Sequence, residues 1–191
     1  MAMIHPMFEQ ILHNFTKNKK GLSPHSKIIF AELNTHLLYL LRFRGVGFEI
    51  LFSCLFSASK YGINNLENSL GTPLGLHTIC EKIGENIPIH GELVGRKFTG
   101  TTINQAVDKT SKAKITSRIL RLKGCELGKN LAYDADGRCC DTYKRCVYIH
   151  GTNLEKFIPA PLSHGCLLLK TTDLITLFDL ITVGDFCLIS A

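Results

Sequence analysis

Short strand-like segments separated by turn-forming residues constrain this chain more than any other feature of its sequence. From residue 27 onward, runs rich in β-branched and aromatic residues recur, and Gly, Asn, Asp and Ser interrupt them. We predict strands at residues 27–33, 37–42, 48–57, 76–81, 91–95, 115–122, 146–149 and 186–189. Many short strands with little helix predict a mainly β domain, built as a sandwich or an open barrel with one or two short helices.

Helical periodicity occurs in two segments. In residues 6–17 the apolar positions recur at helical spacing; they are Met7, Phe8, Ile11, Leu12 and Phe15. The second segment begins near Thr172, which is suited to cap a helix, and we expect it to end at Gly184. Its apolar positions at helical spacing are Leu174, Leu177, Phe178 and Ile181. We expect residues 1–25 to form an N-terminal helical extension that packs on one domain, residues 26–191. Residues 99–114 and 127–144 are polar and predict loops, the first of them mobile.

Composition limits the classes of protein that this chain can be. Its 191 residues are 45% hydrophobic and 20% charged, which fits a folded domain with a sizeable core. The net charge of +6 is spread along the chain without a groove-reading motif, so we expect no nucleic-acid partner. No window approaches the roughly 18 apolar residues of a membrane span. His5 and Glu9 occupy the place of the apolar stretch of a secretory signal, so no signal is visible.

The sequence contains eight cysteines, which are candidates for disulfide bonds, metal binding or catalysis. They make up about 4% of the chain, short of the roughly 8–10% of a disulfide scaffold, and several lie in apolar runs. This pattern is typical of reduced, buried thiols and favours a reducing compartment. One alternative is a zinc site formed by Cys139, Cys140, Cys146 and His150. Adjacent cysteines are poor ligands for one tetrahedral ion and no C-x₂-C pair exists, so we expect neither a metal nor a cofactor.

Two segments carry residues suited to nucleophilic catalysis: Tyr-Ile-His-Gly-Thr at 148–152 and Ser-His-Gly-Cys at 163–166. A cysteine nucleophile needs a base, because the thiolate is the attacking form. His150 at the end of a predicted strand would be a rigidly held base for Cys166. Gly165 permits a sharp turn, and the N–H groups of Gly165 and Cys166 suit an oxyanion hole. The alternative is that Cys166 is a buried filler like most cysteines.

These two segments resemble the signature of the L,D-transpeptidase family, also called the YkuD domain. Further stretches are similar to parts of that family: Thr-Pro-Leu-Gly at 72–75, Phe-Ser-Ala-Ser at 56–59, the strand at 115–120, and Val-Gly-Asp-Phe-Cys-Leu-Ile at 183–189. The resemblance extends from about residue 26 to residue 189. It implies the open β fold of that family.

The resemblance also implies roles for individual residues. Cys166 would be the nucleophile, His150 the general base, and the Gly151 carbonyl the group that orients the histidine ring. Ser163, His164 and Gly165 would shape the nucleophile loop. The candidates for substrate contacts are Thr72, Pro73, Gly75 and Arg118. The alternative for the first three is a purely structural turn, and the alternative for Arg118 is an arginine that faces outward from its strand.

The implied reaction is peptidoglycan cross-linking. The cysteine would attack a stem tetrapeptide, release D-alanine, and pass the acyl group to an amine; carbapenems acylate the thiol of this family. A water acceptor would make the protein an L,D-carboxypeptidase. The implied location is the cell envelope, where the family serves wall synthesis and cell shape, with the cytoplasm as the alternative because no signal is visible.

Two positions depart from the family pattern. Leu168 stands where the family usually has Arg or Asn, and His36 stands where it usually has Gln. A polar group at position 168 would brace the nucleophile loop or contact substrate. Its loss leaves a third alternative open, a homologue that binds the wall without turnover. The oligomeric state has no signal in the sequence.

Overall fold

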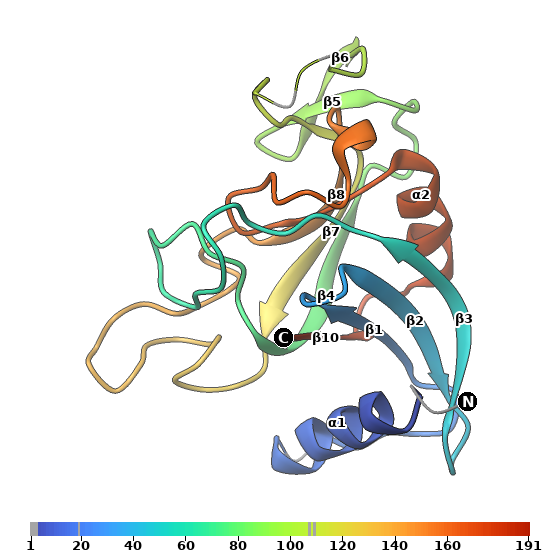
Figure 1. Cartoon of the computed structure of the whole chain (residues 1–191), viewed down its shortest axis with the longest axis vertical. Helices are drawn as coiled ribbons and strands as arrows, with labels where there is room; N and C mark the ends of the chain where they lie inside the picture. Colours follow the sequence, from blue (N-terminus) through green and yellow to red (C-terminus); the bar gives the residue numbers. More distant parts are fainter. Residues whose placement is uncertain (1–3, 19, 107, 109) are drawn as a thin grey trace.

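The computed structural model describes residues 4–18, 20–106, 108 and 110–191 (Figure 1). Its elements in chain order are α1 (Ile4–Lys17), β1 (Lys27–Glu32), β2 (Leu37–Phe43), β3 (Phe48–Leu55), β4 (Gly75–Ile83), β5 (Gly91–Val94), β6 (Lys97–Thr102), β7 (Ile115–Gly124), β8 (Tyr148–Thr152), the 3₁₀ helix η1 (Glu155–Phe157), β9 (Leu167–Leu169), α2 (Thr171–Leu180) and β10 (Phe186–Ser190).

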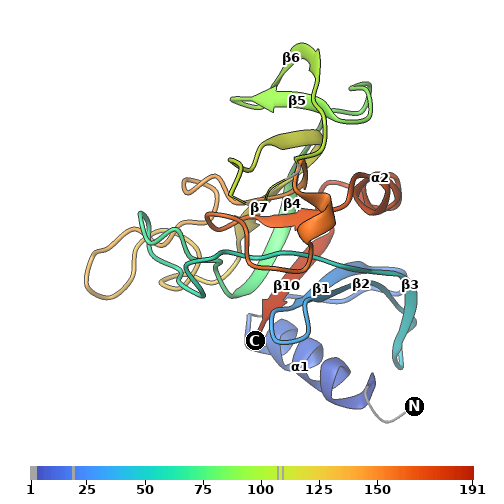
Figure 2. The same ribbon diagram turned by 45° about the horizontal axis from the view of Figure 1, so that its top comes forward.

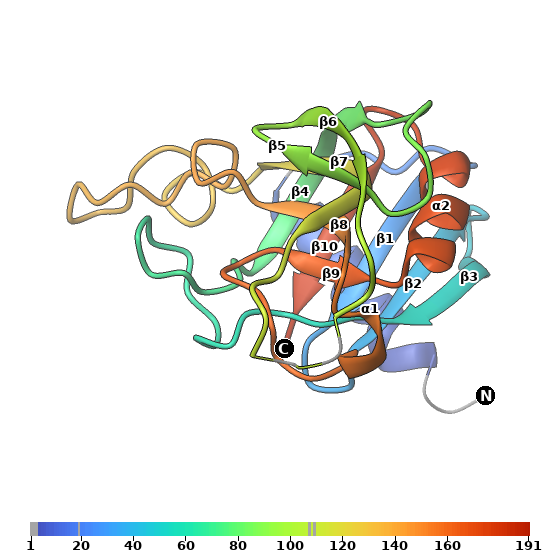
Figure 3. The ribbon, with the colours of Figure 1, turned by 90° about the horizontal axis from the view of Figure 1, so that it is seen from above.

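The strands form one open sheet with the order β3-β2-β1-β10-β4-β7-β5-β6, from which β8 and β9 branch at β7. Strand β7 is the centre of the topology, because it pairs antiparallel with β4, β5 and β8. Strand β9 then pairs with β8 in parallel, and the view from above shows the two side by side (Figure 3). The mainly β, open fold expected from the sequence is confirmed.

The main core lies inside the curved sheet and is closed by α2. Apolar side chains from β1, β2, β4, β7, β8, β9, β10 and α2 meet there, among them Ile29, Leu40, Leu120, Ile149 and Leu177, all fully buried. Burial of such side chains contributes about 1.5–3 kcal/mol each. This core holds β8 and β9 in place by one face and leaves their other face for the site.

A smaller core forms where α1 lies across the outside of β1, β2 and β10 (Figure 2). Ile11 and Phe15 are buried there, as the predicted packing of this helix on the main body requires. Leu12, which also belongs to the apolar positions at helical spacing, is 44% exposed. The side chains of Met7 and Phe8 lie outside the described part of the chain.

Two strands were missed by the sequence patterns. Residues 99–102 were expected in a loop, but β6 forms a hairpin with β5, and all its residues are exposed, so it carries no apolar alternation. Strand β9 has three buried leucines, too few to show a period. Strand β8 also begins and ends later than predicted, which places His150 in the middle of the strand rather than at its end.

The second helix differs at both ends from its prediction. Lys170 is the N-cap without a side-chain cap, and Thr172 lies inside the first turn. The helix ends at Leu180, before Gly184. Thr171, the first residue of the helix, donates a hydrogen bond from its hydroxyl to the Glu155 carboxylate, with 2.6 Å between the two oxygens. The first residue of the helix is thus tied to η1, where Glu155 lies.

Two long loops, residues 56–74 and 125–147, extend from the same side of the sheet and lie next to each other (Figures 1 and 3). They are joined where the Glu67 N–H donates to the Cys139 carbonyl at 2.8 Å and where Arg145 donates to the Gly71 carbonyl at 2.7 Å. Within the described residues, no helix combines the length and apolarity that crossing a membrane requires.

Candidate functional site

His150 is held on β8 by its neighbours on both sides. Its Nδ1 lies 2.8 Å from the carbonyl oxygen of Gly151, which favours the tautomer with a proton on Nδ1 and a free lone pair on Nε2. A Cβ at position 151 would lie 2.7 Å from the Thr116 carbonyl oxygen, so only glycine fits between β8 and β7 there. Burial lowers the pKa of His150 to about 4, although the Gly151 carbonyl opposes this shift. The ring is therefore neutral at pH 7.

Cys166 immediately precedes β9, and the parallel pairing of Ile149 with Leu167 places it beside Tyr148. Successive side chains of a strand alternate in direction. Ile149 and Leu167 face the main core, so Tyr148, His150 and Cys166 share the opposite face. The Cys166 sulfur lies 3.4 Å from the Tyr148 amide nitrogen and 3.8 Å from the Cys146 carbonyl oxygen.

The Cys166 thiol is held in its protonated form. Burial raises its pKa to about 11, and the Tyr148 N–H and the positive charge of Arg145 act in the opposite direction. The surroundings that cause this are apolar: Cys166 contacts one cluster that contains Leu93, Ile119 and Tyr148, and a second that contains Leu154, Leu162 and Leu168. The site at rest is a neutral thiol on the same sheet face as a neutral imidazole.

The turn before Cys166 is fixed by Ser163. The buried Ser163 hydroxyl donates to the Cys166 carbonyl at 2.6 Å and accepts from the Gly165 N–H at 3.2 Å. Gly165 has a φ of +120°, which other residues rarely adopt. Its N–H, predicted to face an oxyanion, is therefore used inside the turn in this conformation.

Leu168, at the position that departs from the family pattern, is buried and pairs with His150 across the β8–β9 ladder. Its own backbone exchanges hydrogen bonds with Ser57, at 2.8 and 3.0 Å. Position 168 therefore forms an apolar wall of the site, and a different residue must supply any polar support for the turn.

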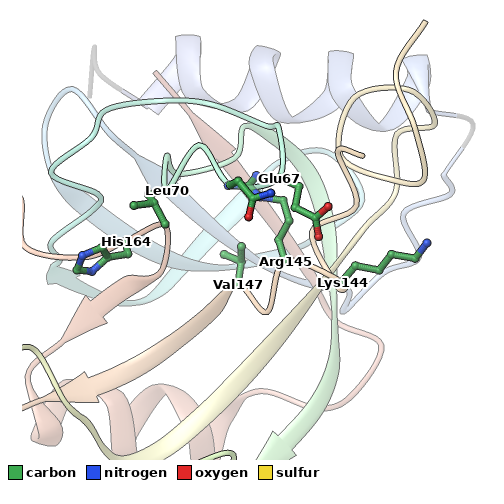
Figure 4. Close-up of a pocket in the computed structure, with 7 residues that line it drawn as sticks. Glu67, Leu70, Lys144, Arg145, Val147 and His164 are labelled. Atoms are coloured by element: carbon green, nitrogen blue, oxygen red, sulfur yellow. The ribbon is translucent and has the colours of Figure 1, made fainter. Parts of the chain in front are cut away.

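Two cavities lie on either side of this turn, and the exposed His164 lines both. The larger has a volume of about 630 Å³ and is bounded by Leu154 and Leu162, which also contact Cys166, and by Lys60 and Lys112. The smaller, of about 200 Å³, lies between the two long loops. Figure 4 shows His164 at one end of it and Lys144 at the other, with Arg145 and Val147 between them.

Three predicted substrate contacts lie behind the turn. Thr72 is buried, accepts from the Ser59 N–H at 3.0 Å, and lines a separate cavity of about 170 Å³ that also includes His36. Pro73 is buried next to it. A Cβ on Gly75 would lie 2.1 Å from the Glu126 carboxylate. These contacts give Thr72 and Gly75 structural roles, which was the alternative left open.

Arg118 is directed away from the cysteine. Its guanidinium donates to the Ile87 carbonyl at 2.6 Å and lies 5.6 Å from the centre of the Phe178 ring on α2. The structure therefore does not bring Arg118 to Cys166.

Arg145 is the residue of this site that sequence reasoning missed. It comes from the second long loop, three residues before Tyr148, and its charge acts on Cys166. A basic residue in a polar loop has no periodicity or motif to distinguish it, so only the structure places it here.

All eight cysteines are free. Cys54, Cys140 and Cys187 are buried as expected. Cys146 is exposed, so the prediction of buried thiols is wrong for that residue. Within the described residues, no three His, Cys, Asp or Glu side chains are arranged to hold a metal ion, the residues of the zinc alternative included.

The chain resembles known proteins in family and in fold. The family model for the L,D-transpeptidase catalytic domain, YkuD, matches residues 26–189. No curated protein matches the chain significantly. Among solved structures, the chain is similar to the helical cell shape determining protein Pgp2 from Campylobacter jejuni, in its K307A mutant, with 16% identity, a TM-score of 0.54, and coverage of 86% of this chain and 46% of that chain.

Two further structures resemble it. Bd1075 from Bdellovibrio bacteriovorus is 14% identical with a TM-score of 0.50, covering 85% of this chain and 46% of that chain. An L,D-transpeptidase from Mycobacterium smegmatis is 16% identical with a TM-score of 0.49, covering 87% and 59%. The chain thus spans between 46% and 59% of the length of these three proteins. The identities to Pgp2 and Bd1075 are low enough that this likeness concerns the fold alone.

Proposed function

Because the chain belongs to the YkuD family of L,D-transpeptidase catalytic domains, we propose that it is a cysteine L,D-transpeptidase that acts on peptidoglycan stem peptides. The observation that carries the proposal is the shared sheet face of Cys166 and His150, with the histidine ring oriented by the Gly151 carbonyl at 2.8 Å. A nucleophile, a base and a group that orients the base are the minimum set for acyl transfer by a thiol.

Acylation begins with the neutral pair. As the Cys166 sulfur attacks the carbonyl carbon before the terminal D-alanine, its proton passes to Nε2 of His150. The pKa of the thiol is about 11 and that of the imidazole about 4, so a free ion pair is unfavourable and proton transfer accompanies C–S bond formation. The oxyanion of the tetrahedral intermediate takes a backbone N–H; of the two predicted donors, the Cys166 N–H remains for this role.

Collapse of the intermediate breaks the C–N bond. The protonated His150 returns its proton to the leaving nitrogen, D-alanine departs, and the acyl group stays on Cys166 as a thioester. An acceptor amine then attacks the thioester carbon and gives its proton to His150. Release of the new amide returns that proton to the sulfur, so the site ends as it began.

The two cavities support a reaction with two peptide substrates. They flank the nucleophile turn and share His164, which offers an acyl donor and an acceptor amine separate places to bind next to that turn. The larger cavity has two lysines and, among its described lining residues, no acid, which suits the carboxylates of a stem peptide.

The test is incubation of purified tetrapeptide muropeptides with the protein and with Cys166→Ala, followed by mass analysis. We expect a cross-linked dimer plus free D-alanine from the native chain and neither product from the variant. A tripeptide without dimer would instead identify an L,D-carboxypeptidase. Binding of muropeptides without any product would identify the homologue without turnover that Leu168 suggested.

A carbapenem offers a direct test of the nucleophile, because its strained amide acylates a reactive thiol without a peptide acceptor. Intact-mass measurement should show one adduct on the native chain and none on Cys166→Ala. The proposed substrate places the protein in the cell envelope; fractionation of cells with an antibody against the chain tests this, and exclusive recovery from the cytoplasm would contradict it.

A further inference from the structure

The guanidinium of Arg145 joins the two long loops through three hydrogen bonds. Nη1 donates to the Asn64 carbonyl at 3.1 Å, and Nη2 donates to the Gly71 carbonyl at 2.7 Å and to the Ser69 hydroxyl at 3.4 Å. These three acceptors belong to one long loop, whereas Arg145 belongs to the other. Its planar fork can hold several carbonyls at once, which an ammonium on a flexible stem does poorly.

The Gly71 carbonyl links Arg145 to the nucleophile turn. The same oxygen that accepts from Arg145 would lie 3.1 Å from a Cβ on Gly165, so it packs directly behind the residue before Cys166. The contact closes off space on that side of the turn. Fixing the Gly71 carbonyl therefore limits how far the turn can move back.

The charge of Arg145 also reaches the sulfur. It lowers the pKa of Cys166 against the larger effect of burial, and the Cys166 thiolate in turn raises the pKa of Arg145, which burial lowers. The remaining electrostatic influence, the nearby Cys146, acts to raise the pKa of Cys166. Leu168 adds an apolar wall and no charge.

We propose that Arg145 is a positioning residue for Cys166, which holds the Gly71 carbonyl behind the nucleophile turn and whose positive charge favours the thiolate. Both effects favour the thiolate in an attacking position: the first limits the positions of the turn, and the second stabilises negative charge as it forms on sulfur. The inference rests on the proposed function only for the identity of the nucleophile.

Two variants separate the effect of the Arg145 charge from the effect of its planar guanidinium. Arg145→Gln removes the charge, and Arg145→Lys keeps the charge but loses the planar fork. The matched control is Arg138→Gln, an arginine of the same loop whose exposed side chain pairs with Asp134 and Asp136. The first readout is the pH dependence of iodoacetamide alkylation at Cys166, followed by peptide mass spectrometry because seven other thiols are present. The second is the rate of carbapenem acylation.

We expect Arg145→Gln to raise the alkylation midpoint by roughly 0.5–1 pH unit, since a nearby opposite charge is removed. Arg145→Lys should retain the native midpoint and lose about tenfold in acylation rate, and Arg138→Gln should match the native chain in both. A purely structural residue would change thermal stability without moving the midpoint.

Two outcomes overturn the inference. A folded Arg145→Gln with the native midpoint removes the charge effect, and Arg145→Lys with the native acylation rate removes the positioning effect. Should Arg145→Gln fail to fold, Arg145→Lys decides by its acylation rate. Alkylation does not depend on any peptide substrate, so the result stands apart from success or failure of the muropeptide assay.

Discussion

The sulfur of Cys166 lies 3.4 Å from the amide nitrogen of Tyr148, two residues before His150 on the same strand. The proposed nucleophile therefore lies against the backbone of the strand that carries the proposed base. This N–H favours the thiolate, yet burial dominates and keeps the pKa at about 11. In the proposed reaction the sulfur passes its proton to His150, which lies two residues further along the same strand.

The neutral resting pair predicts a distinctive pH dependence for His150→Gln. At pH 7 we expect acylation by a carbapenem to fall by roughly 10²–10⁴-fold, the usual contribution of a general base. The deficit should shrink as the pH approaches 11, because hydroxide then removes the thiol proton without the histidine. Single-turnover acylation measured by intact mass between pH 5 and pH 10 checks this.

The native chain supplies the comparison for that experiment. Its acylation rate should drop at low pH only as the solution approaches pH 4, where His150 takes a proton and loses its basic lone pair. A constant ratio between native chain and His150→Gln at every pH would contradict the role of His150 as base.

The second prediction concerns Gly165→Ala. At φ +120° an alanine is strained, and its Cβ would press on the Gly71 carbonyl oxygen at 3.1 Å. We expect a stability loss of about 1–3 kcal/mol and a loss of at least tenfold in acylation rate. Gly137→Ala is the control, because Gly137 also has a positive φ, of +74°, but has open space around it. It should cost about 1 kcal/mol and leave acylation unchanged; equal acylation losses in both variants would show that the turn has no special role.

Ser163 supports a third prediction. Removal of its hydroxyl by Ser163→Ala leaves the Cys166 carbonyl and the Gly165 N–H without their shared partner, which costs about 1–3 kcal/mol at a buried site. We expect acylation to slow about tenfold, and Ser163→Thr to restore most of the rate since it keeps the hydroxyl. Urea unfolding and carbapenem acylation measure the two effects. Native acylation by Ser163→Ala would exclude Ser163 from shaping the turn.

The contacts of the candidate site that sequence reasoning can anticipate are those between residues close together in the sequence. His150 and Gly151 are neighbours in the sequence, and Ser163 and Cys166 are three residues apart, so each motif contains both partners of its own contact. Strands such as β1 and β10 were predicted because burial leaves an apolar run in the sequence.

What sequence reasoning missed depends on contacts between distant residues. Strand β9 forms because three leucines pair with β8, and each pairs with a residue eighteen positions earlier in the sequence. Arg145 reaches Gly71 across a separation of 74 residues, and Arg118 is drawn to α2 by Phe178. A single sequence shows the identity of each residue in such a pair but not which partner it meets.

The last prediction uses His77, which is fully buried on β4 and lies outside the site. Its Nδ1 lies 2.9 Å from the Gly75 carbonyl and its Nε2 lies 3.1 Å from the Thr142 hydroxyl, an arrangement that suits the neutral ring. Burial lowers its pKa from 6.5 to about 4. Between these two pKa values the unfolded chain binds a proton at His77 and the folded chain does not. The contribution of His77 to the free energy of unfolding is therefore intact above pH 6.5 and is lost as the pH falls toward 4.

His77→Gln should flatten this dependence. Between pH 7.5 and pH 4.5 we expect the free energy of unfolding of the native chain to fall by about 2–3 kcal/mol more than that of the variant. Urea unfolding at both pH values, followed by circular dichroism, measures the difference. His150, whose pKa is lowered in the same direction, remains in both proteins, so its contribution cancels in the comparison. Parallel stability curves for the two proteins would mean that the pKa of His77 is the same in the folded and the unfolded chain, so that burial does not lower it.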